Sequence, residues 1–155
     1  MEKLKNLQTL LKTKNIAAYI IPTSDYHNSE YISEHFKSRA KISGFTGSAG
    51  TLLVTQTKAL LWTDGRYHIQ AQKELENTNI TLMKQGLSNV PTIIQFLNSE
   101  LNTNDVLAFD GRLMNANFVI NMLKEIKSGI TINSNVNLID EVWNDRPELP
   151  FSILY

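Results

Sequence analysis

The first half of the chain changes between helical and strand-like hydrophobic patterns. Residues 2–14 repeat leucine every three to four positions, which predicts one buried face of an amphipathic helix. The apolar run 16–21 predicts a buried strand, and Pro22 ends it because proline has no N–H for a neighbouring strand. Residues 29–36 then predict a short helix. Residues 41–43 predict a short strand that leads into a loop rich in glycine.

The second half continues with strands and helices in alternation. Residues 52–55 and 59–63 read as two strands joined by a tight turn, a β-hairpin. The period then becomes helical over residues 66–75, where Asp64 or Thr63 can cap the free amides of the first turn. Later segments predict strands at 79–83, 106–110 and 130–132, a helix starting at Pro91, and a helix over 115–127. The fold class predicted is α/β, with a mixed β-sheet and helices on both faces.

Composition narrows the class of protein. With 155 residues, 42% hydrophobic and 19% charged, the chain fits one globular domain with a sizeable core. Fifteen basic residues balance fifteen acidic ones, so we expect neither nucleic acid nor an anionic membrane as a partner. Without cysteine, disulfides and thiol catalysis are excluded. The N-terminus has no signal-peptide core, and a cytoplasmic location is expected.

The segment GFTGSAGT places Gly44, Gly47 and Gly50 around Ser48. A phosphate-binding P-loop needs a second glycine where Ala49 stands, followed by lysine, and this segment has neither. The G-x-S-x-G pattern of a nucleophilic serine also fails by one residue. We therefore interpret the three glycines as a structural loop, with a backbone that binds a ligand as the alternative.

Three side chains are candidates for a functional site. Asp25 and His27 follow the end of a predicted strand, and Arg66 begins a helix just after another strand. Ligand sites in α/β sheets favour the carboxyl ends of strands. The alternative is a cap for Asp25, a loop imidazole for His27 and a surface cation for Arg66. The remaining imidazoles, His35 and His68, complete no compact metal-ligand spacing, so no metal site is predicted on this chain.

Four segments resemble a known family. They are YIIPTSDYHNSEYI (19–32), SGFTGSAGTLLVT (43–55), LLWTDGRYHIQAQKEL (60–75) and EVWNDRPELP (141–150). In this order and spacing they resemble the N-terminal domain of Xaa-Pro aminopeptidases (aminopeptidase P), a domain shared with creatinase and prolidase. The resemblance implies the creatinase/prolidase N-terminal fold, which contains a ribonuclease H-like motif.

The resemblance also implies that catalysis takes place in a separate domain. Residues 1–143 would form a non-catalytic N-terminal domain, and residues 144–155 would begin the linker to a C-terminal catalytic pita-bread domain absent from this chain. That missing domain would hold two metal ions, usually manganese, and remove the N-terminal residue that precedes proline in a peptide. This chain alone would bind no cofactor and cleave nothing.

Within such an enzyme, the domain would gate substrate access and support the contacts of a homodimer. Asp25, His27 and Arg66 would help to line the substrate entrance. The alternative is a stand-alone module of the same fold that binds a ligand or a protein and has no enzymatic activity. The natural reading frame after Tyr155 separates these hypotheses, because a catalytic domain needs a long continuation.

Overall fold

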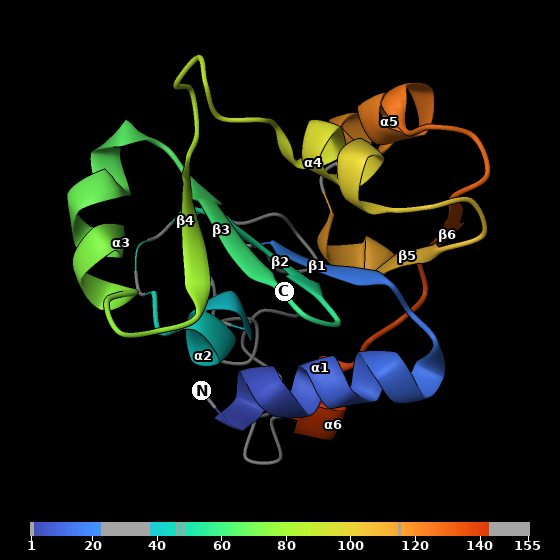
Figure 1. The fold of residues 1–155 in the computed structure, drawn as a ribbon, viewed down its shortest axis with the longest axis horizontal. Helices are drawn as coiled ribbons and strands as arrows, with labels where there is room; N and C mark the ends of the chain where they lie inside the picture. Colours follow the sequence, from blue (N-terminus) through green and yellow to red (C-terminus); the bar gives the residue numbers. More distant parts are fainter. Residues whose placement is uncertain (1, 23–37, 46, 48, 115, 143–155) are drawn as a thin grey trace, which may run out of the picture.

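The fold is built on one six-stranded sheet, seen in a computed structural model that describes residues 2–22, 38–45, 47, 49–114 and 116–142 (Figure 1). Its strands are β1 (Ala18–Pro22), β2 (Thr51–Thr55), β3 (Ala59–Thr63), β4 (Ile80–Lys84), β5 (Val106–Phe109) and β6 (Thr131–Asn133). The strand order is β4-β3-β2-β1-β5-β6. Only β2 runs antiparallel to its neighbours, so the predicted mixed sheet is confirmed.

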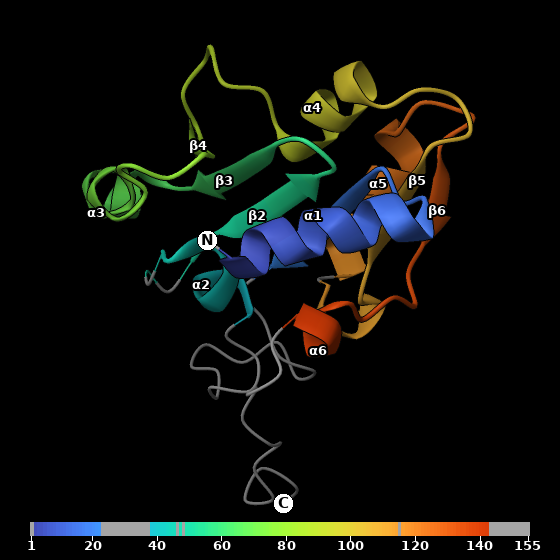
Figure 2. The same ribbon diagram turned by 60° about the horizontal axis from the view of Figure 1, so that its bottom comes forward.

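Helices cover both faces of this sheet, as predicted. They are α1 (Glu2–Lys14), α2 (Ser38–Ser43), α3 (His68–Glu74), α4 (Ile93–Glu100), α5 (Ala116–Glu125) and α6 (Ile139–Val142). One hydrophobic cluster joins the sheet to α1, α2, α3 and α6, and a second joins it to α4 and α5. Figure 1 shows α1, α2 and α6 on one side of the sheet, away from α4 and α5, and Figure 2 shows the molecule with that side turned forward. No helix in the described part of the chain is long and apolar enough to cross a membrane.

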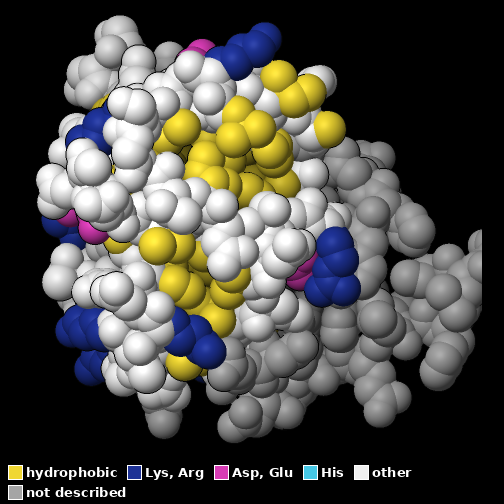
Figure 3. Space-filling view, turned by 90° about the vertical axis from the view of Figure 1, so that its right-hand side faces the viewer, with side chains coloured by type: hydrophobic (Ala, Val, Ile, Leu, Met, Phe, Trp, Pro, Cys, Tyr) yellow, Lys and Arg dark blue, Asp and Glu magenta, His cyan; other side chains and the backbone are white. Residues whose placement is uncertain are grey.

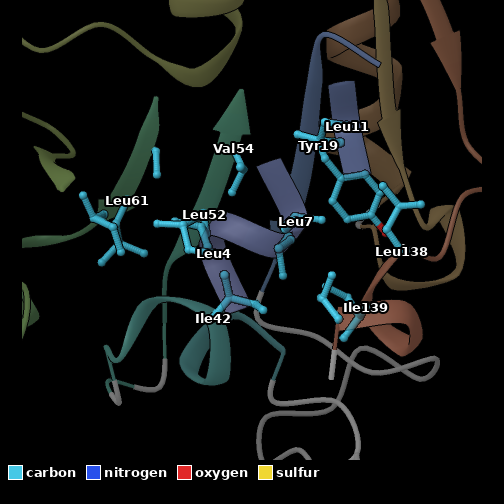
Figure 4. Close-up of a cluster of buried hydrophobic side chains, with 14 of the residues drawn as sticks. Leu4, Leu7, Leu11, Tyr19, Ile42, Leu52, Val54, Leu61, Leu138 and Ile139 are labelled. Carbon is cyan, nitrogen blue, oxygen red and sulfur yellow. Dashed lines mark hydrogen bonds between the residues drawn. The ribbon is translucent and has the colours of Figure 1, made fainter. Parts of the chain in front are cut away.

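The leucine repeat of α1 explains how this helix attaches to the sheet. Leu4, Leu7 and Leu11 are buried in the cluster drawn in Figure 4, where Leu4 lies beside Leu52 of β2 and Leu11 beside Tyr19 of β1. Burying each such side chain stabilises the fold by roughly 1.5–3 kcal/mol. Tyr19 of β1 adds a polar link, because its hydroxyl donates to Val136 O at 2.6 Å. The face of the sheet under α1 is therefore closed by both apolar packing and a hydrogen bond.

The prediction of a strand at residues 41–43 is wrong, because these residues end helix α2. Arg39, Ile42 and Ser43 are buried, at a spacing of three to four residues that suits a helix. The Ser43 hydroxyl donates to Arg39 O one turn earlier, at 2.6 Å. Three residues are too few for an alternating pattern to separate a strand from the last turn of a helix.

Other boundaries differ from the predictions in smaller ways. Asp110 lies beyond β5, where it caps the short 3₁₀ helix η3 (Gly111–Leu113). Helix α6 was not predicted, since its four residues are too few to show a period. The predicted helix at 29–36 and the predicted linker at 144–155 lie outside the described residues.

Candidate functional site

The carboxyl edge of the sheet collects the loops that carry the candidate residues. Because β1, β3, β4, β5 and β6 run parallel, their carboxyl ends meet at one edge, where β2 begins. The crossover through α3 packs on one face of the sheet and the crossover through α5 packs on the other. Such a change of face marks the place where open α/β sheets bind ligands, at the carboxyl ends of the strands.

Arg66 lies at this edge, in a turn that follows β3. Asp64 caps the 3₁₀ helix η2 (Gly65–Tyr67) by accepting a hydrogen bond from the Arg66 backbone N–H at 3.0 Å. The Arg66 guanidinium donates through Nε and Nη2 to the two carboxylate oxygens of Asp64, at 3.0 and 2.9 Å. It also lies over the Tyr67 ring, 5.1 Å from the ring centre. Arg66 therefore has a local carboxylate partner and, with a side chain 70% exposed, remains open to a second one.

This pairing shifts both ionisable groups. The pKa of Asp64 lies below its usual value, chiefly because the Arg66 side chain donates to it, and the pKa of Arg66 is raised chiefly by the same bond. Both groups are solvent-exposed, so water screens their attraction. The pair fixes the direction of the guanidinium fork rather than stabilising the fold.

A second turn of the same sequence lies at the same edge, and sequence reasoning missed it. After β5, Asp110 accepts from the backbone N–H of Arg112 at 3.1 Å and from its Nε and Nη2 at 3.0 and 2.9 Å. The two turns are about 14 Å apart, since three strand spacings of about 4.8 Å separate β3 from β5. The signal was available: the tripeptide Asp-Gly-Arg occurs at both 64–66 and 110–112.

The glycine loop enters β2 between these two turns. Gly44 has a φ of +81°, a conformation that favours glycine. Gly47 and Gly50 lack that feature, but a Cβ on Gly50 would lie 2.8 Å from Arg39 Nη1 and 3.1 Å from Trp62 O. A Cβ on Gly47 would overlap the ring of Phe45. The first glycine thus permits a turn, while the other two permit close packing.

Arg39 lies beneath this loop and is only 4% exposed. Its Nη2 donates to Gly47 O, and its guanidinium carbon lies 4.8 Å from the centre of the Phe45 ring. Within the described residues, Nε and Nη1 have no hydrogen-bond partner. Burial lowers the pKa of Arg39 to about 10, against the opposing effects of Glu74 and Tyr67. Arg39 is a buried cation that holds the loop by one bond.

The other two candidates, Asp25 and His27, lie outside the described residues, in the segment that follows the carboxyl end of β1. Among the described histidines, His68 has Nε2 3.0 Å from Thr63 O, which joins α3 to the end of β3. No group of three or more His, Cys, Asp or Glu in the described residues could hold a metal ion. The described part of the edge therefore offers guanidinium and backbone groups, and no metal ligand set.

Comparison with known proteins identifies the family. The sequence matches the Creatinase/Prolidase N-terminal domain over residues 3–142. The chain belongs to this family. Aminopeptidase P2 of Arabidopsis thaliana is 43% identical over 156 residues, and the match covers 96% of this chain and 22% of that protein. The probable Xaa-Pro aminopeptidase P of Laccaria bicolor is 41% identical over 152 residues, with 96% and 24% covered.

Solved structures agree with this membership of the creatinase/prolidase N-terminal domain family. The crystal structure of X-prolyl aminopeptidase from Caenorhabditis elegans, described as a cytosolic enzyme with a di-nuclear active site, is similar with a TM-score of 0.86 and 37% identity. That match covers 96% of this chain and 26% of the other. The N-terminal domain of PepQ from Mycobacterium tuberculosis, at 17% identity and a TM-score of 0.65, shares the fold. This chain spans about a quarter of the length of the aminopeptidases it matches.

Proposed function

We propose that this chain is the non-catalytic N-terminal domain of a metal-dependent Xaa-Pro aminopeptidase. The observation that carries the proposal is the match over 96% of the chain to enzymes of that name at 41–43% identity. The similarity to the C. elegans enzyme supports it in three dimensions. The reaction proposed for the whole protein is removal of the N-terminal residue that precedes proline in a peptide.

We assign the metal ions to the catalytic domain that would follow this one. The described residues present no suitable cluster of ligands, and the C. elegans relative is described as having a di-nuclear active site. Two metal ions, proposed to be manganese, would activate a hydroxide that attacks the peptide bond. The present chain would contribute binding surface rather than chemistry.

The carboxyl edge of the sheet would face that catalytic domain. Arg66 is fixed there by Asp64 and keeps Nη1 without a partner among the described residues, so one donor can reach a peptide carbonyl or a carboxylate. Asp25 and His27 follow β1 at the same edge and would lie nearby. In this role the domain gates substrate access. The proposal also includes a homodimer and a cytoplasmic location. The C. elegans enzyme is described as cytosolic.

The test uses the full-length enzyme and the variant Arg66→Ala. A charge-assisted hydrogen bond is worth roughly 1.5–3 kcal/mol, so we expect kcat/KM for an Xaa-Pro peptide to fall by about 10- to 100-fold. The melting temperature should stay near that of the wild type, because the Arg66 side chain is exposed and its ion pair with Asp64 is screened by water.

Lys58→Ala is the matched control. Lys58 is also an exposed cation in a salt bridge, with Glu100, but it lies in the turn between β2 and β3 at the opposite edge. Its loss should leave kcat/KM unchanged. Wild-type kinetics for Arg66→Ala would make Arg66 a plain surface cation, and a collapse in stability would make it structural.

A further inference from the structure

The two Asp-Gly-Arg turns share a hydrogen-bond pattern but differ in how the rest of the chain covers them. In the second turn, the Gly111 N–H donates to Ser134 O at 2.8 Å, and Asp110 forms a bridge with Asn135. A Cβ on Gly111 would lie 2.8 Å from Ser134 O, and Leu113, the residue after the Asp-Gly-Arg tripeptide, is buried. This turn is closed by the segment that leaves β6.

The described residues provide no such cover for the first turn. A Cβ on Gly65 would have no atom within 4 Å among the described residues, and its φ lies outside the left-handed region. Neither backbone conformation nor packing within the described chain therefore requires glycine at position 65. A glycine that faces open space lets another backbone approach closely.

One further side chain, Ile69, extends this open area onto the first turn of α3. Ile69 is 76% exposed, the highest value for a large hydrophobic side chain in the described ranges. It lies in the first turn of α3, which begins directly after the 3₁₀ helix η2 that carries Gly65 and Arg66, so the three exposed residues are close in the chain. The area combines an apolar side chain, an oriented guanidinium and room for a main chain, which are features of protein–protein contact sites.

We propose that Gly65, Arg66 and Ile69 form a docking surface for the remaining chain of the peptidase. This inference rests on the proposed function. It identifies which residues at the carboxyl edge of the sheet contact the rest of the enzyme. Relatives are about four times as long as this chain, so most of the enzyme lies outside it and has to be held against it. The docking segment brings its backbone over Gly65, an oxygen acceptor to Arg66 and an apolar side chain to Ile69.

A second copy of the domain fits this surface less well. In a symmetric dimer formed through this small surface, the two Arg66 side chains would lie close to each other across the two-fold axis. Their like charges would repel. The exposed hydrophobic side chains Ile120 and Leu123 lie on a different helix, α5. Hydrophobic side chains also gather on the face of the molecule that Figure 3 shows. They supply a control of similar chemistry.

The experiment measures association in the full-length enzyme with a specific protease site inserted within residues 144–155. After cleavage, the unsubstituted domain should stay bound to the remainder during size-exclusion chromatography. Gly65→Gln and Ile69→Ser should each weaken this association at least tenfold, about 1.4 kcal/mol, in a direct measurement of Kd. Ile120→Ser, which removes a side chain 50% exposed on α5, should keep Kd within twofold. Circular dichroism of each variant before cleavage confirms that it is folded.

Three results would overturn the proposal. One is separation of the unsubstituted domain after cleavage, and another is wild-type Kd for both Gly65→Gln and Ile69→Ser. The third is a pair of findings: the uncleaved variants have half the mass of the unsubstituted enzyme by light scattering, and after cleavage the domain stays bound. That pair would assign the surface to a second copy. Because the readout is association, an enzyme that fails to cleave Xaa-Pro peptides would refute the proposed function and leave the docking result standing.

Discussion

Replacing Arg39 by methionine tests whether this buried cation stabilises the domain. The guanidinium is nearly inaccessible and donates to Gly47 O, while Nε and Nη1 lack partners in the part of the chain that the structure describes. A buried charge with few partners is costly to keep. Methionine retains most of the apolar stem of arginine and removes the charge.

The opposing effects of Arg39→Met are similar in size. Burial lowers the pKa of Arg39 to about 10, so holding the charge costs on the order of 3 kcal/mol at neutral pH. The lost bond to Gly47 O is worth roughly 1.5–3 kcal/mol, and the contact with the Phe45 ring about 0.5–2 kcal/mol. We therefore expect the free energy of unfolding to change by less than about 2 kcal/mol. Arg39→Ala also removes the stem and should cost about 2–5 kcal/mol.

Urea denaturation followed by tryptophan fluorescence measures both variants. Lys58→Met is the control for removing a cation, and it should change the unfolding free energy by less than about 1 kcal/mol because Lys58 is exposed. If Arg39→Met proves as destabilising as Arg39→Ala, the reasoning is wrong. The two remaining donors would then have partners in the folded protein, since breaking a buried pair costs about 3–5 kcal/mol.

Two further predictions concern stability and need only thermal denaturation. Tyr19→Phe should lower the free energy of unfolding by about 1–3 kcal/mol, because it leaves Val136 O without its donor; an unchanged melting temperature would show that water replaces the hydroxyl. Gly111→Ala should cost about 1–3 kcal/mol, because the new methyl group meets Ser134 O. Gly65→Ala should instead gain about 0.4–1 kcal/mol, and equal effects at the two glycines would contradict the difference between the turns.

Sequence periodicity predicted the parts of the fold that rest on long or strongly patterned segments. The leucines of α1 repeat over three turns, and the hairpin β2–β3 combines two apolar runs with a short turn, so both were predicted correctly. Helix α4 also carried a local signal, since Thr92 and Gln95 form a reciprocal capping box. In these segments local preference and tertiary packing agree.

The error at residues 41–43 has a tertiary cause. Helix α2 is six residues long and carries a buried arginine, so its inward face does not read as apolar. Arg39 is buried because the glycine loop folds over it, and that contact joins α2 to the start of β2. No pattern within the helix itself contains this information.

The two Asp-Gly-Arg turns mark the limit of local reasoning at the candidate site. The tripeptide forms the same hydrogen bonds twice, with an aspartate cap and a paired arginine within 3.1 Å in each case. The two turns differ in what covers them. Ser134 closes the second turn, whereas in the first turn no atom of the described residues lies within 4 Å of a Cβ on Gly65. Ser134 follows β6 and is more than twenty positions from Gly111 in the sequence. Sequence alone could therefore locate both arginines but could not show which turn is covered. The open turn is the one available to a partner, which is why Gly65 and Ile69, and not Gly111, are the residues to change in the docking experiment.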